Sequence, residues 1–150
     1  MYASISLKRR VLTLEASVRL TEIISSQMRY LSAPIHEIVH RLAANEELSA
    51  LPFLDEINSL INSGAKPHEA WEQSVAKSDC GLSLSDKELL ADFGRELGKS
   101  DVESQLAHCE VFREKLSSRA EDAKSDYTGK GNLYTTIGVV CGLGIATLLI

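Results

Sequence analysis

Charge is missing from the last part of this 150-residue chain. The 16 basic and 21 acidic residues all lie at or before Lys130, and residues 131–150 carry none. The charged part, residues 1–130, is long enough for one hydrophobic core but not for two domains. The formal net charge of −5 argues against a general nucleic-acid binder, which needs a basic face to displace counterions. We therefore divide the chain into a charged domain and an uncharged tail, residues 131–150.

Cysteine is scarce. The three cysteines, Cys80, Cys109 and Cys141, lie far apart and form no C-x-x-C pair. Neither a disulfide framework nor a zinc knuckle is indicated, and reduced thiols in a cytosol-facing domain are the simplest interpretation. The chain also lacks a Walker A motif, a G-x-G-x-x-G and a G-x-S-x-G. These absences leave nucleotide binding and serine hydrolysis unsupported. We expect no cofactor and no small-molecule substrate.

Strand-like alternation is also missing, since no stretch of more than four residues shows it. Apolar residues at helical spacing instead predict a long first helix over residues 4–30. Pro34, Pro52 and Pro67 are each placed to begin a helix, and Gly64 is placed to end one. We expect an all-α fold, a small bundle of five to six helices plus a C-terminal transmembrane helix.

Two capping boxes of the form S-x-x-E predict the last two helix starts of the charged domain. They are Ser85 with Glu88, and Ser100 with Glu103. The first of these helices is expected to end near residue 97, and the second to run over residues 101–126. Trp71, on the helix that follows Pro67, is expected to be buried in the core.

The uncharged tail predicts a single membrane span. The stretch Leu133–Ile150 is uncharged throughout, and as a helix it extends roughly 27 Å, close to the roughly 30 Å hydrocarbon core of a bilayer. Lys124 and Lys130 precede it and no charge follows, so the positive-inside bias puts the charged domain in the cytoplasm. Gly138 and Gly142 form a G-x-x-x-G that favours close helix packing in lipid, although simple tolerance of glycine explains them equally well. The alternative is a buried C-terminal helix of a soluble domain.

One stretch has the form of a catalytic motif, the H-E-x-x-H of His36, Glu37 and His40. In zinc hydrolases two such histidines bind the metal and the glutamate activates its water. No separate segment marks a third protein ligand. The simpler interpretation is that Ile38 and Val39 face the core while the other three residues lie on the helix surface.

Four short motifs occur in order along the chain. They are T-E-I followed by M-R-Y and a proline (residues 21–34), a glycine followed by E-A-W (residues 64–71), F-G-R-E-L-G-K-S-D followed by a glutamine (residues 93–105), and N-L-Y followed by two glycines (residues 132–142). Together they resemble the signature of the stage III sporulation protein AB family, and the resemblance covers essentially residues 7–150.

This resemblance implies a function. Members of the family are made in the mother cell of endospore-forming bacteria, as part of a secretion-like complex that links mother cell and forespore. Their helical domain is similar to the cytoplasmic domains of the F-type platform protein of type II secretion, and they are not enzymes. The implied partners are the complex's cytoplasmic ATPase, its other membrane subunits and membrane lipid. The implied location is the mother-cell membrane facing the forespore.

The resemblance also draws attention to a tight corner between the last two helices of the charged domain. Gly98 is expected as a left-handed C-cap, Ser100 as the cap of the next helix, and Asp101 as a negative charge favoured at its N-terminus. Gln105, one turn later, is placed to form hydrogen bonds across the bundle. Both a structural role and a direct contact role stay open for Asp101 and Gln105. Glu22, in an apolar stretch, is expected to be buried against an arginine and to tie two helices together.

The family begins with a membrane segment that precedes a basic cluster. Here only Met1–Leu7 precede Lys8–Arg10, and seven residues cannot span a bilayer. The basic triplet fits the cytoplasmic flank of a first span that was either omitted from this sequence or lost from this member of the family. The leading hypothesis is a non-enzymatic platform subunit of a sporulation secretion complex. The alternatives are a membrane-tethered zinc hydrolase and a tail-anchored helical adaptor unrelated to sporulation.

Overall fold

The chain is all-α over the residues that its computed structural model describes. These are residues 2–31 and 33–149 for the backbone, and 5–31 and 33–128 for the side chains; they contain no β-strand. The elements are α1 (Tyr2–Leu31), α2 (Ile35–Ala43), the 3₁₀ turn η1 (Glu46–Leu48), α3 (Phe53–Asn62), α4 (Pro67–Lys77), α5 (Leu84–Glu96) and α6 (Val102–Leu149). The six α-helices confirm the all-α prediction.

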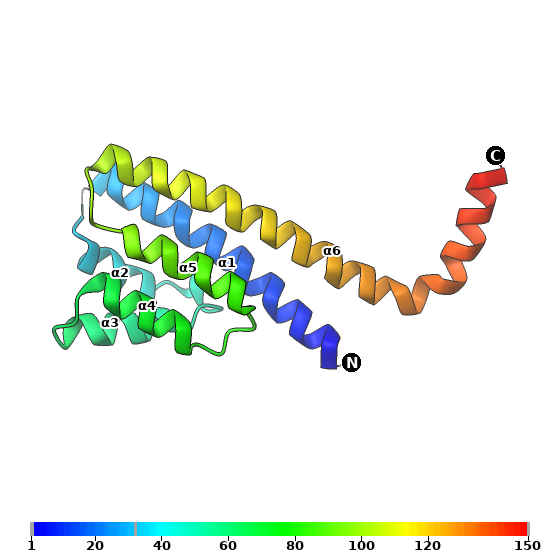
Figure 1. Cartoon of the computed structure of the whole chain (residues 1–150), viewed down its shortest axis with the longest axis horizontal. Helices are drawn as coiled ribbons and strands as arrows, with labels where there is room; N and C mark the ends of the chain where they lie inside the picture. The colour runs from blue at the N-terminus through cyan, green and yellow to red at the C-terminus, as the bar shows by residue number, and fades with distance from the viewer. Residues whose placement is uncertain (1, 32, 150) are drawn as a thin grey trace.

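The two longest helices, α1 and α6, lie side by side and run in opposite directions (Figure 1). Both helices contribute fully buried apolar residues, which include Leu14 and Ile24 of α1 and Cys109, Leu116 and Ala123 of α6. Burial of these apolar faces supplies the driving force for pairing. The shorter helices α2 to α5 pack against one side of this pair (Figure 1).

The shorter helices pack around Trp71 of α4, which is buried as expected. Its indole Nε1–H donates to the Leu90 carbonyl oxygen of α5 at 2.9 Å, and its ring meets Phe53 and Phe93 edge-on. Gly94 of α5 lies directly against the indole, because a Cβ built there would be 2.0 Å from Trp71 Cδ1. A glycine at this position therefore lets α4 and α5 pack closely.

The helix boundaries follow the proline and glycine signals. Pro34 and Pro52 occupy the N-cap positions of α2 and α3, and Pro67 lies in the first turn of α4. Gly64 follows α3 with a φ of +101°, which glycine adopts without the steric cost of a Cβ. Helix α6 does not end near Asp126 as expected but continues to Leu149.

Both predicted capping boxes are wrong. Helix α5 is capped by Ser83 and Asp86, two residues before the predicted pair, whose glutamate Glu88 is exposed. Helix α6 begins at Val102, so the residue directly before it is Asp101 and not Ser100. In each case the expected serine instead accepts a hydrogen bond from another side chain, Ser85 from Arg119 and Ser100 from Gln105.

Candidate functional site

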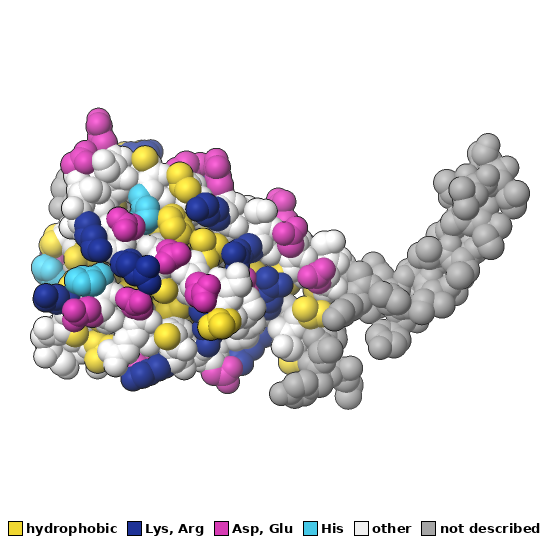
Figure 2. Space-filling view, viewed as in Figure 1, with side chains coloured by type: hydrophobic (Ala, Val, Ile, Leu, Met, Phe, Trp, Pro, Cys, Tyr) yellow, Lys and Arg dark blue, Asp and Glu magenta, His cyan; other side chains and the backbone are white. Residues whose placement is uncertain are grey.

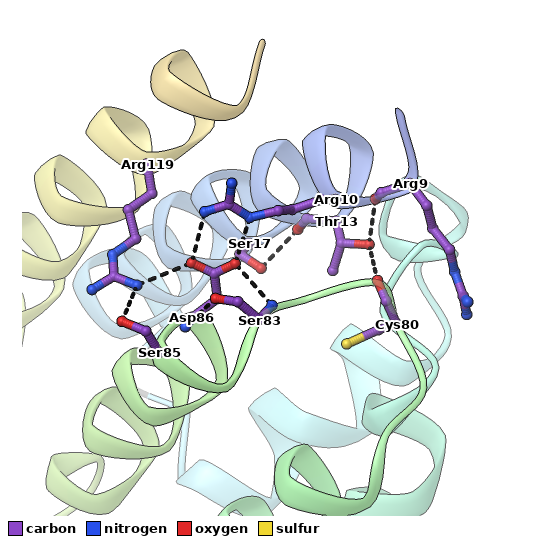
Figure 3. Close-up of polar contacts among 9 residues, drawn as sticks. All are labelled: Arg9, Arg10, Thr13, Ser17, Cys80, Ser83, Ser85, Asp86 and Arg119. Carbon is purple, nitrogen blue, oxygen red and sulfur yellow. Dashed lines mark hydrogen bonds and ion pairs between the residues drawn. The ribbon is translucent and has the colours of Figure 1, made fainter. Parts of the chain in front are cut away.

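A buried carboxylate, Asp86 at the start of α5, joins three helices. Its Oδ2 accepts from Arg10 Nε of α1 at 2.7 Å and its Oδ1 accepts from Arg10 Nη2 at 3.2 Å, a bidentate contact. Arg119 Nη1 of α6 donates to the same Oδ1 at 3.0 Å and to Ser85 Oγ at 2.9 Å. Figure 3 shows the carboxylate between these two arginines. We call Arg10, Ser83, Asp86 and Arg119 the Asp86 junction.

The electrostatics of the junction favour an ionised Asp86 at neutral pH. Burial by itself raises the pKa of this carboxyl group, but hydrogen bonds from Arg10, Arg119 and Ser83 outweigh it and lower the pKa to about 2. The Ser83 backbone N–H donates to Asp86 Oδ2 and the Ser83 hydroxyl accepts from the Asp86 backbone N–H, both at 3.1 Å. The Asp86 side chain thus both caps α5 and pairs with two arginines.

The loop before α5 is held on α1 by neighbouring contacts. The Thr13 hydroxyl donates to the Cys80 carbonyl oxygen at 2.7 Å, and the Arg9 guanidinium binds the carbonyl oxygen and the carboxylate of Asp79. Gly81 has a φ of +81°, and a Cβ there would lie 3.0 Å from Arg9 Cγ. Two residues of the basic cluster, Arg9 and Arg10, therefore make contacts within the domain.

The opposite end of α5 is a corner built around the neutral side chain of Gln105. Its side-chain Nε2 donates to the Glu96 carbonyl oxygen at 2.8 Å and to Ser100 Oγ at 2.9 Å, while its Oε1 accepts from the Gly98 backbone N–H at 3.2 Å. Gln105 is buried, and Gly98 has the predicted left-handed conformation with a φ of +81°. The side-chain amide of Gln105 thus satisfies backbone groups at the end of α5. We call Glu96, Gly98, Ser100 and Gln105, together with Asp101, the α5–α6 corner.

Asp101 completes the corner at the start of α6. Hydrogen bonds from the Ser104 hydroxyl and from the backbone amides of Glu103 and Ser104 lower the pKa of this exposed carboxyl group. Because α6 begins at Val102, Asp101 takes the capping role that was expected of Ser100. The structure thus brings Gly98, Asp101 and Gln105 together in one corner.

Glu22 lies elsewhere, and the expectation that it is buried is wrong. Its side chain is 43% exposed and pairs with Arg19, one turn earlier on α1, at 3.3 Å. Arg19 also reaches Glu47 of η1 at 3.0 Å. Residues adjacent in the sequence of a helix face different directions, so the apolar neighbours of Glu22 do not bury it.

The residues of the H-E-x-x-H motif lie on the surface of α2. His36, Glu37 and His40 are exposed while Ile38 and Val39 are buried, as the simpler interpretation predicted. Within the described part of the chain no group of three or more His, Cys, Asp or Glu residues is close enough to hold a metal ion. The geometry therefore offers no support for a zinc hydrolase.

The predicted membrane span lies outside the residues whose side chains the structure describes. This holds for Gly138 and Gly142 as well, so their packing role stays a prediction, as does the domain boundary at residue 130. Among the residues that were described, no helix combines the length and the apolar character that crossing a bilayer requires.

Sequence reasoning missed three residues of the Asp86 junction, namely Asp86, Arg10 and Arg119. A local signal for Asp86 was present, because Ser83 and Asp86 have the spacing of a capping box. The two arginines gave none, since they lie 76 and 33 positions away along the chain.

Comparison with known proteins identifies the family. The family model described as "Stage III sporulation protein AB (spore_III_AB)" matches residues 1–150. This chain belongs to the stage III sporulation protein AB family. It is similar to the Stage III sporulation protein AB of Bacillus subtilis (strain 168), with 26% identity over 144 residues that cover 94% of this chain and 82% of the relative. No solved structure matches. Membership in the stage III sporulation protein AB family supports a role in sporulation.

Proposed function

We propose that this protein is a non-enzymatic membrane platform subunit of the secretion-like complex that links mother cell and forespore. The Asp86 junction is the observation that carries the proposal. Since Arg10 of α1 and Arg119 of α6 bind one carboxylate, the start of α1 and the later part of α6 lie at the same end of the bundle. Beyond this end α6 continues to Leu149, and residues 131–150, inserted in the membrane, would tether the domain there.

In this proposal α5 connects the membrane-proximal end with the opposite end of the domain. One end of α5 is fixed by the Asp86 junction and the other by the α5–α6 corner. Its packing on Trp71 makes it a stiff element, because close-packed interiors deform little. A cytoplasmic ATPase acting on the domain would displace α5 together with α1 and α6, and so reach the other membrane subunits.

The surface chemistry suits a protein partner better than a nucleic acid. Figure 2 shows acidic and basic side chains interspersed over the face drawn, with no extended basic area. A nucleic-acid binder concentrates basic residues on one face. The domain would therefore work by binding other subunits, with no cofactor and no small-molecule substrate.

The test compares the full chain with a variant that lacks residues 131–150, each expressed during sporulation in a strain without the native gene. We expect the full chain in the membrane fraction and normal numbers of heat-resistant spores. The truncated chain should be soluble, folded by circular dichroism, and unable to restore spore formation. Membrane binding that persists without the tail, or spore formation by the soluble form, would overturn the proposal.

A further inference from the structure

We draw no further inference here: the strongest candidate, the apolar groove between α4 and α5 that Ala76, Leu84 and Ala91 line, carries nothing because nothing in the structure shows what covers it.

Discussion

The two ends of α5 are fixed by different chemistry. The Asp86 junction holds three helices through a fully buried carboxylate and two arginines whose side chains are 24% and 33% exposed. The α5–α6 corner holds two helices through a neutral amide, Gln105, and a glycine in the left-handed conformation. Loss of one partner destabilises a buried charge cluster more than it destabilises a neutral network, because an unpaired charge is costly to bury.

The difference in chemistry follows the sequence distance between the residues that each end of α5 brings together. At the junction, Arg10 and Arg119 lie 76 and 33 positions from Asp86 along the chain, so side chains must bring the three helices together there. At the corner the chain itself connects α5 to α6 through residues 97–101, and the geometry is set by backbone conformation. Long-range alignment therefore rests on ion pairs here, and local alignment rests on a turn.

The largest effect is expected from Asp86→Ala. It removes the cap of α5 and leaves Arg10 and Arg119 without their carboxylate, which we expect to lower the free energy of unfolding by about 3 kcal/mol. Thermal unfolding of the full chain in detergent, followed by circular dichroism, measures it. The control is Asp92→Ala on the same helix, whose side chain is 54% exposed, with an expected loss below about 0.5 kcal/mol. Equal losses for the two variants would show that the junction adds nothing beyond surface charge.

The second prediction separates the charge of Asp86 from its shape. A carboxylate with a folded pKa of about 2 contributes stability at any pH above its unfolded pKa near 4, and this contribution disappears as the pH falls from about 4 through 2. At neutral pH the shift corresponds to about 2 kcal/mol. Asp86→Asn keeps the shape but cannot ionise, so its stability deficit should shrink over this range. Urea unfolding of both proteins at pH 7, 4 and 2.5 measures the deficit, and a constant deficit would contradict the ionic account.

Most of the fold could be predicted from sequence because its signals are local. Pro34, Pro52, Pro67 and Gly64 mark helix ends within a few residues of where they occur, and apolar spacing gives the long α1. The all-α class needs nothing more. The length of α6 was misjudged because a change from charged to apolar composition near residue 130 was interpreted as the end of a helix.

Of the two ends of α5, only the α5–α6 corner was predicted from the sequence. Gly98 and Gln105 act within one turn of a helix end, where spacing is informative. The Asp86 junction was not predictable, because two serines, Ser83 and Ser85, each precede an acidic residue by three positions. Asp86 of the first box accepts from the distant Arg10 and Arg119, and Ser85 of the second accepts from Arg119. The prediction that Glu22 is buried was wrong for a related reason: residues adjacent in the sequence of a helix face different directions.

The smallest effect is expected at the corner, from Gly98→Ala. A Cβ at Gly98 would meet only Ile35 Cγ2, at an ordinary 3.8 Å, so the cost comes from the φ of +81° and not from a clash. A left-handed alanine costs about 1 kcal/mol, which thermal unfolding resolves. Gly94→Ala is the informative control, because its Cβ would overlap the Trp71 ring and should both destabilise the domain further and change the fluorescence of this single tryptophan. If Gly98→Ala destabilised the domain as much as Asp86→Ala, the contrast between a charged junction and a corner set by backbone conformation would not hold.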